Sequence, residues 1–190
     1  DARDAAGATA ADAGTIAGSG QVTGDGAGTA NDGRVTVAAG AEIIHNTGTV
    51  STVGGEIVST SGKITYDAGE TIRIGDTTTT NAAAIVRTVN GNIEMDADPT
   101  APNTPNATAI TFSDAATMAA NEVLVETVSG NITINGTGVS DGTTSFNRGV
   151  LIESGSVVRS IGTGMGVGTI AITGTGGAGE DNNDGVRIAN

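Results

Sequence analysis

Two pairs of carboxylates are the residues of this chain whose types and spacing could carry out acid–base chemistry. Asp96 and Asp98 lie two residues apart, and no basic residue follows them nearby. Asp181 and Asp184 lie three residues apart, close to Arg187. Enzymes that cleave polysaccharides need two or three acidic groups within about 5–10 Å, usually beside Arg or Lys. Sugar clefts also stack rings on aromatic side chains, and the chain has one Tyr, two Phe and no Trp. We therefore interpret these carboxylates as solvated loop residues and expect no enzyme.

The second acidic pair is also a candidate calcium site. The run from Glu180 to Gly185 (EDNNDG) offers carboxylate and amide oxygens in a flexible turn, and calcium prefers such hard ligands. The run lacks the alternating Asp spacing and the distal Glu of an EF-hand loop. We name Asp181 and Asp184 as the candidate calcium ligands. The alternative is a turn rich in Asn and Asp because these residues tolerate left-handed backbone.

Other metal chemistry has little support in the sequence. His45 is the single histidine and the chain has no cysteine, so a transition-metal site would need ligands from another chain. We expect His45 to be an exposed or half-buried imidazole. We expect no cofactor other than the candidate calcium.

The charge of the chain excludes several classes of partner. Eight basic and 21 acidic residues give a net charge of −13, and the pI is near 4.1. Nucleic-acid binding needs a basic surface, and an anionic membrane repels an acidic one. No apolar run approaches the roughly 18 residues that span a bilayer, so we expect no membrane insertion. The chain begins at Asp1, as a processed protein or a fragment would.

A sequence motif that the chain repeats four times indicates the strands that must position these residues. The copies are IVSTSGKITY (57–66), IVRTVNGNIEM (85–95), LVETVSGNITI (124–134) and VVRSIGTGMGVGTIAI (157–172). Each copy is a short apolar strand, a Thr or Ser, a glycine corner and a second strand with alternating apolar residues. Such self-similarity predicts a solenoid, in which one unit stacks on the next.

The spacing of the strands favours a parallel β-helix over hairpins. The repeats follow each other at 132 − 93 = 39 and 170 − 132 = 38 residues, and further strands lie within and after the last interval. Strand centres then fall at Ile132, Val150, Ile170 and Val186, in steps of 18, 20 and 16 residues. We expect one coil of about that length, closed by Gly-rich corners. The residues expected to line the core are Ile57, Ile64, Ile72, Ile74, Val86, Ile93, Val125, Ile132, Ile134, Ile152, Ile170, Ile172 and Ile188.

We divide the chain into two parts. Residues 1–33 are a Gly/Ala-rich N-terminal arm or a set of weak solenoid turns, and residues 34–190 are the parallel β-helix. Residues 96–107, which hold all three prolines, and residues 135–147 are expected to be loops that leave the rod on one side. Residues 115–122 are expected to form one helical turn.

Three segments carry a resemblance to known repeats. GNITINGTG (130–138), NRGVLIESGSVVRSIGTG (147–164) and GTIAITGTGGAGEDNNDGVRI (168–188) resemble the repeats of large bacterial surface proteins of the filamentous-haemagglutinin-like and autotransporter-like type, especially cyanobacterial adhesin repeats. The similarity covers about residues 57–190. It implies an all-β, right-handed parallel β-helix that is exported and displayed outside the cell, and it carries no catalytic motif.

These features predict a structural protein rather than an enzyme. A solenoid has two open ends that must be capped or paired, and no cap is visible in the sequence. We expect a structural subunit of an extracellular bacterial filament or surface fibre that joins head to tail, helped by the N-terminal arm. Its expected partners are copies of itself, and also cell-surface polysaccharide or other matrix components. The alternatives are an adhesin stalk segment of a larger exported protein and, from another class, a carbohydrate-active β-helix enzyme.

Overall fold

The described part of the protein consists mostly of strands in parallel sheets. The computed structural model describes residues 8–10, 14–17, 20–23, 34–37, 43–46, 50–53, 55–59, 63–68, 71–75, 84–98, 108–113, 123–140, 145–153 and 155–189. Side chains are described from Ile57 onward, apart from those of Val58, Ser59, Asp67 and Met165. These residues form eighteen short strands and one turn of 3₁₀ helix, η1 (Gly164–Gly166). The helical turn expected at residues 115–122 lies outside the described residues.

Three sheets of six strands contain all of the described strands. Sheet A consists of β1 (Ala8–Ala10), β4 (Arg34–Val37), β7 (Gly55–Ser59), β10 (Ala84–Thr88), β13 (Val123–Thr127) and β16 (Ser156–Ser160). Sheet B consists of β2 (Gly14–Ala17), β5 (Ile43–Asn46), β8 (Ile64–Ala68), β11 (Ile93–Ala97), β14 (Ile132–Thr137) and β17 (Ile170–Thr175). Sheet C consists of β3 (Gly20–Thr23), β6 (Val50–Val53), β9 (Ile72–Ile74), β12 (Ile110–Phe112), β15 (Val150–Ile152) and β18 (Val186–Ile188).

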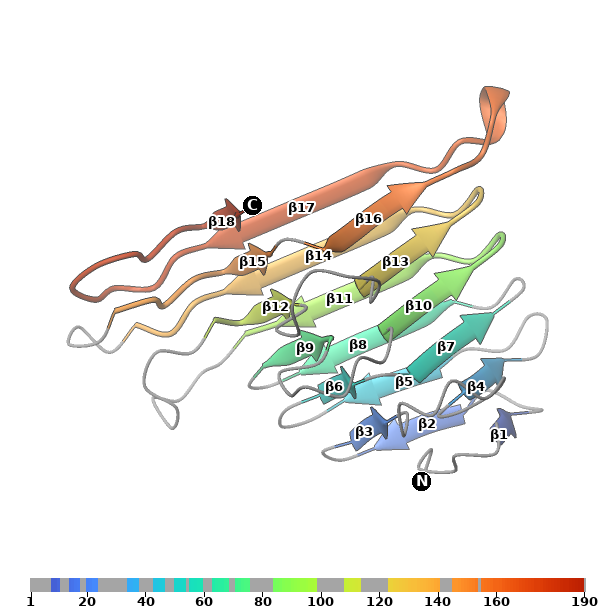
Figure 1. The fold of residues 1–190 in the computed structure, drawn as a ribbon, viewed down its shortest axis with the longest axis horizontal. Helices are drawn as coiled ribbons and strands as arrows, with labels where there is room; N and C mark the ends of the chain where they lie inside the picture. The colour runs from blue at the N-terminus through green and yellow to red at the C-terminus, as the bar shows by residue number, and fades with distance from the viewer. Residues whose placement is uncertain are drawn as a thin grey trace.

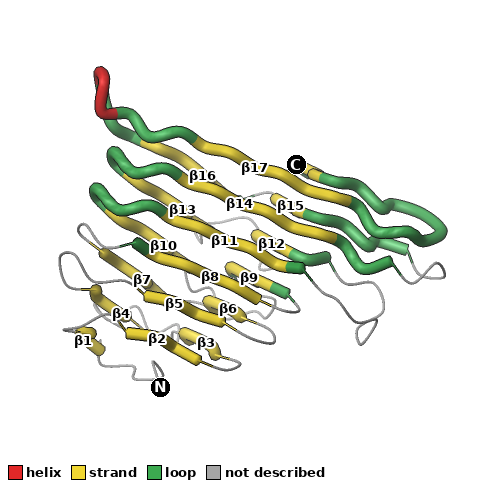
Figure 2. Tube along the Cα trace, turned by 180° about the vertical axis from the view of Figure 1, so that it is seen from behind, coloured by secondary structure: helices red, strands yellow, loops and turns green. Residues whose placement is uncertain are grey.

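Consecutive strands lie in sheets A, B and C in turn, so every three strands complete one solenoid-like coil. Each strand pairs in parallel with the strand three positions along the chain. The coils stack in chain order, from the first coil (β1–β3) at the bottom of Figure 1 to the last coil (β16–β18) at the top. Figure 2 shows the same stack from behind, with the strands of successive coils side by side.

The expected coil length of 16–20 residues is wrong. Ile132 and Val150 lie in sheets B and C of one coil, and β16 of sheet A follows before the chain returns to sheet B at Ile170. Residues in register in sheet B give the true coil lengths, which range from 64 − 43 = 21 to 132 − 93 = 39 residues. The strands of all three sheets carry similar Ile and Val residues. The sequence pattern therefore did not show that each coil contains three strands.

The sequence motif that occurs four times corresponds to one corner of the coil. Each copy supplies a strand of sheet A, the corner, and the next strand of sheet B: β7 and β8, β10 and β11, β13 and β14, and β16 and β17. The copies are aligned without offset, because Ile93 pairs with both Ile64 and Ile132, and Ile132 pairs with Ile170. Residues at equivalent positions of the four copies therefore stack on each other.

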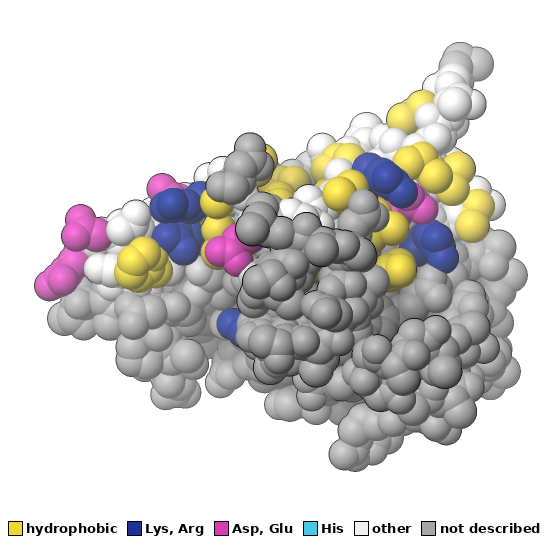
Figure 3. All heavy atoms as spheres, viewed as in Figure 1, with side chains coloured by type: hydrophobic (Ala, Val, Ile, Leu, Met, Phe, Trp, Pro, Cys, Tyr) yellow, Lys and Arg dark blue, Asp and Glu magenta, His cyan; other side chains and the backbone are white. Residues whose placement is uncertain are grey.

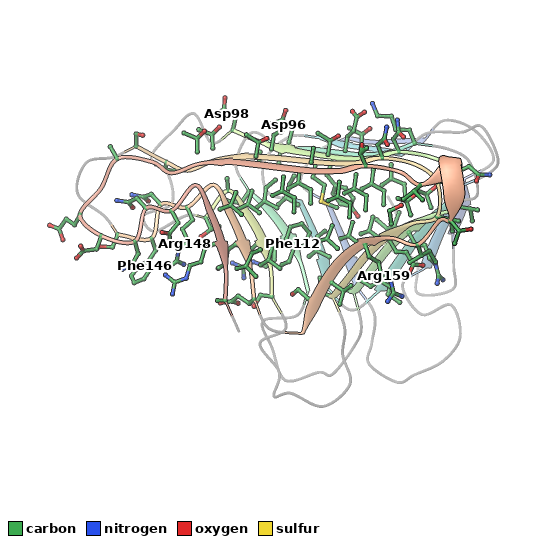
Figure 4. All side chains as sticks on the ribbon, turned by 90° about the horizontal axis from the view of Figure 1, so that it is seen from above. Asp96, Asp98, Phe112, Phe146, Arg148 and Arg159 are labelled. Carbon is green, nitrogen blue, oxygen red and sulfur yellow. The ribbon has the colours of Figure 1, made fainter. Side chains whose placement is uncertain are left out.

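Side chains that point between the three sheets form the core. Their members are Ile and Val residues in columns along the stack, with Tyr66, Met95 and Phe112 as the largest additions. Figure 4, viewed along the stack, shows these side chains filling the space between the sheet of β17 and the sheets of β16 and β18, with Phe112 in the interior. β-branched side chains suit such a thin core, because they fit closely on pleated surfaces.

Strands also lie within residues 1–33. β1, β2 and β3 pair in parallel with β4, β5 and β6 and so belong to the three sheets. The division of the chain at residue 33 remains a prediction.

A flange of paired loops extends from the last two coils. We define it as residues 138–140 and 145–149 of one coil and residues 176–185 of the next. Backbone hydrogen bonds join its two layers, with Gly177 N donating to Asn147 O at 2.8 Å and Phe146 N donating to Asp181 O at 2.8 Å. Figure 2 shows these loops running side by side beyond β14 and β17. The loops expected to begin at Asp96 and Asn135 begin later, since these two residues lie in register in β11 and β14.

Candidate functional site: the exposed last coil

Among the described strands, those of the last coil form one free edge of each sheet. β16, β17 and β18 each have one neighbour, which is β13, β14 and β15 respectively. Backbone N–H and C=O groups on such an edge are available to pair with another strand. The three free edges face the same way along the stack, at the top of Figure 1. This coil therefore presents three strand edges at one end of the described stack.

Three inward side chains of the last coil are exposed although their register partners in the preceding coil are buried. Ile170 is 42% exposed and Val186 is 41% exposed, whereas their register partners Ile132 and Val150 are fully buried. Ile188 is 71% exposed above the buried Ile152. A column of core residues thus ends in an uncovered residue in sheets B and C.

The expected core is confirmed for Ile57, Ile64, Ile72, Ile74, Val86, Ile93, Val125, Ile132, Ile134 and Ile152. It is wrong for Ile170 and Ile188, because no described strand covers them, while Ile172 is partly buried. Among the described residues, seven large apolar side chains are exposed, and five of them belong to residues 161–188. Figure 3 shows hydrophobic side chains near the upper edge of the molecule, around the position of β16. The exposed apolar surface is therefore concentrated on the last coil.

A ladder of Thr and Asn side chains fixes the corner between sheets A and B. Thr127 Oγ1 accepts a hydrogen bond from Gly130 N at 2.9 Å. Asn131 N donates to Asn92 Oδ1 at 2.9 Å, and Asn131 Oδ1 accepts from Thr169 N at 2.9 Å. The Thr127 bond closes the corner within one coil, and the two Asn bonds join one coil to the next. The ladder aligns the backbone of successive coils and reaches the last coil at Thr169.

The glycines of this corner are required by the close approach of successive coils. A Cβ on Gly130 would lie 1.7 Å from the carbonyl oxygen of Gly91, and a Cβ on Gly168 would lie 1.6 Å from that of Gly130. Real atoms do not approach so closely, so a side chain at either position would push the coils apart. The glycine corner therefore sets the spacing of the stack.

An ion pair also joins the last coil to its neighbour on the outer face of sheet A. Arg159 Nε lies 2.6 Å from Glu126 Oε2, and the two residues are in register on β16 and β13. The Glu126 side chain is 5% exposed, whereas the Arg159 side chain is 47% exposed. Figure 4 shows Arg159 on the outside of β16. A buried carboxylate needs such a partner, because an unpaired buried charge is costly.

The flange places one of the two predicted calcium ligands between arginines. Asp184 Oδ2 lies 3.5 Å from Arg148 Nε and 3.5 Å from Arg187 Nη1. Arg148 is buried, and its guanidinium carbon lies 4.8 Å from the centroid of the Phe146 ring. Figure 4 shows Phe146 and Arg148 next to each other in the flange. Sequence reasoning missed Arg148 and Phe146, because they lie in the coil before Asp184 and only the alignment of coils brings them together.

The surroundings of Asp181 and Asp184 favour an ion pair over a calcium site. Asp181 is exposed and its backbone carbonyl accepts the hydrogen bond from Phe146 N. Two guanidinium groups beside Asp184 would repel a divalent cation. No group of three or more His, Asp or Glu side chains comes together anywhere in the described part of the chain. Calcium at this turn stays a prediction.

The other carboxylates lie on the outer face of sheet B. Asp96 and Asp98 are exposed, and Figure 4 shows both outside this sheet. A depression of about 420 Å³ lies over β8, β11 and β14, and its lining includes Glu94, Asp96 and Asn135. Glu94 Oε2 lies 2.7 Å from Lys63 Nζ, so its carboxylate is already paired. Glu94 and Asp96 lie two residues apart on β11 and therefore face the same side of the sheet.

The described lining of this depression lacks the exposed aromatic rings that sugar-binding clefts use. Phe112 is fully buried in the core. Tyr66 contributes to the lining but is itself fully buried, which leaves no ring face for a sugar. Phe146 is 44% exposed but belongs to the flange. The depression therefore offers polar groups without an aromatic platform.

His45 is placed by its backbone alone. It lies in β5, in register with Ile16 and Tyr66. Its side chain lies outside the described residues, so the expectation of an exposed or half-buried imidazole stays a prediction.

Comparison of the chain with known protein families, with curated proteins and with solved structures finds no match. A search of the described residues for a helix long and apolar enough to cross a membrane also finds none.

Proposed function

We propose that the chain is a structural subunit of an extracellular bacterial filament or surface fibre. In this proposal the stack is a right-handed parallel β-helix, the hand that crossover connections between parallel strands almost always take. Copies join head to tail through the open ends of the stack, with residues 1–33 contributing to the join. Head-to-tail contacts of this kind repeat without closing and produce an open fibre.

The observation that carries this proposal is the uncovered last coil. Ile170, Val186 and Ile188 continue columns that are buried one coil earlier, and β16, β17 and β18 each have a free edge. An apolar surface of this kind, combined with free strand edges, marks a surface used for association. The net charge of −13 suits a protein that stays soluble until its ends meet.

The energies indicate that the strand edges matter as much as the apolar side chains. Covering Ile170, Val186 and Ile188, which are 42%, 41% and 71% exposed, contributes roughly 1 kcal/mol for each side chain. Association costs about 4–15 kcal/mol in lost freedom. Backbone hydrogen bonds between the coils, each of about 1 kcal/mol net, must supply most of the remainder. The proposed join therefore needs strand pairing and not only apolar contact.

Electron microscopy and sedimentation of the purified 190-residue chain test the proposal. We expect thin fibres of one coil in width, and sedimentation coefficients that rise with concentration. Isolated short rods at every concentration would contradict the proposal. The solution should contain no denaturant, since unfolded chains also aggregate, and circular dichroism should show β structure before and after assembly.

The second candidate is an adhesin stalk segment of a larger exported protein. Its support is the stacking of successive coils without offset, since a further coil of the same polypeptide would cover the last coil equally well. A 190-residue chain that stays monomeric, and that remains monomeric but becomes more stable when further coils are fused to Asn190, would favour this candidate. Cell-surface polysaccharide and other matrix components are the proposed ligands of either form.

A further inference from the structure

We infer that the last coil of one copy docks on the first coil of a second copy with no offset in register. In this join β16 pairs with β1, β17 with β2, and β18 with β3 of the next copy. The inference rests on the proposed head-to-tail assembly and adds the docking strands and their alignment.

The two ends of the stack are the two halves of one interface. Inside the chain, every coil pairs with the next through one strand of each sheet, always in parallel. Among the described strands, β1, β2 and β3 form the opposite edges of the three sheets from β16, β17 and β18. A second copy placed on the last coil in the same orientation continues all three ladders. An end-to-end dimer related by a two-fold axis would run the strands antiparallel and would close the assembly.

The columns of the core define the register of the join. Val125 stacks on Val158, Ile132 on Ile170 and Val150 on Val186. At the other end, the same columns begin with Ala8, Gly14 and Gly20, which pair with Val35, Ile43 and Val50. Continuing each column without offset aligns Val158 with Ala8, Ile170 with Gly14 and Val186 with Gly20 of the next copy.

The residue types at the join are complementary in size. The last coil presents exposed Ile170 and Val186, and the aligned residues of the next copy are both glycine. Ile188, which is the most exposed of the set, aligns with Val22. A slip of one residue would place the inward set of one coil against the outward set of the next, because strand side chains alternate between faces. Only shifts by an even number of residues keep the faces matched.

Cysteine pairs on the outer face of sheet B test the register. The chain has no cysteine of its own. Ala171 faces outward from β17, in the column of Thr133, and continuing that column aligns it with Thr15 of the next copy. Neighbouring strands lie about 4.8 Å apart, within the range that a disulfide can bridge. The double variant Ala171→Cys with Thr15→Cys should therefore form covalent chains of many subunits under mild oxidation.

A control pair shifts one partner by two residues on the same face. In the double variant Ala171→Cys with Ala17→Cys, the Cα atoms would be about 8 Å apart at zero offset, beyond disulfide reach. A second in-register pair, Thr173→Cys with Ala17→Cys, tests the same register if the first double variant fails to fold. Non-reducing gel electrophoresis of assembled material measures the covalent ladder.

The outcomes separate the register from the proposed function. Ladders from both in-register pairs and none from the control support the inference. Fibres without a ladder, or a ladder from the control pair, would overturn the register and leave the proposed function standing. A covalent dimer from Ala171→Cys alone would indicate tail-to-tail closure and overturn the inference. Absence of any assembly in the unmodified chain would overturn the proposed function, and the inference with it.

Discussion

Ile170 lies in register with Ile132 in sheet B, yet Ile132 is fully buried and Ile170 is 42% exposed. The two residues have the same type, the same strand position and the same inward direction. Only the presence of a covering coil distinguishes them. The exposed Ile170 therefore belongs to the surface on which the proposed assembly depends. A substitution at this position tests its role in assembly.

Replacing Ile170 with Asp should prevent assembly while leaving the fold of the single chain intact. The carboxylate would have to be buried, unpaired, against the next copy, which is costly. Ala171→Asp is the matched control, because Ala171 is the next residue of β17 and faces outward. Sedimentation should show monomers for the first variant and unchanged assembly for the second. Assembly of both variants to the same extent would show that the last coil is not the interface.

Replacing Arg159 with Ala should lower the free energy of unfolding by about 2 kcal/mol, because Glu126 would then be buried without this partner. Chemical denaturation monitored by circular dichroism measures the change. Arg73→Ala is the control, since Arg73 is exposed on the outer face of β9, and it should change stability by less than about 0.5 kcal/mol. Equal effects of the two variants would mean that the ion pair does not stabilise the stack.

Replacing Gly130 with Ala should destabilise the chain by more than about 2 kcal/mol or prevent folding, because the added Cβ would meet the carbonyl of Gly91. Gly166→Ala is the matched control, since a Cβ at Gly166 would have no atom within 4 Å. Thermal unfolding of both variants measures the difference. A Gly130→Ala variant as stable as the control would show that the coils can separate at this corner without loss.

Replacing Asp184 with Asn should lower stability in calcium-free buffer by about 1 kcal/mol, because Arg148 and Arg187 would lose a charged partner. EDTA should leave the melting temperature of the unmodified chain unchanged. Asp181→Asn is the control, and as an exposed carboxylate it should have little effect. A melting temperature that rises with added calcium, and that no longer rises in either Asn variant, would instead support a calcium site.

The sequence was sufficient to predict the stacking but not how deeply each inward residue is buried. Ile170 and Ile188 were expected in the core because their alternation matches that of Ile132 and Ile152, and burial depends on a neighbour that the pattern does not encode. The coil length was misjudged for a related reason. Val150 and Ile170 look equivalent as strand centres, although they lie in sheets C and B.

The candidate site could be predicted only where its residues are close in sequence. The acidic run that contains Asp184 is visible in the sequence. Its neighbour Arg148 is 184 − 148 = 36 residues away in the sequence. The alignment of two successive coils brings the two side chains together. The same holds for Arg159 and Glu126. Contacts between coils require the register, and the register requires the true coil length.

The parallel stacking of the coils also has a mechanical consequence. Hydrogen bonds between parallel strands lie across the strands, so in this stack they point along its axis. Tension applied along a fibre would load the bonds of all three sheets at one junction together, while successive junctions share the same force. The strength of the fibre would then equal that of its weakest junction. In the proposed assembly this is the junction between copies, where no covalent chain crosses, so a stretched fibre should break into whole subunits.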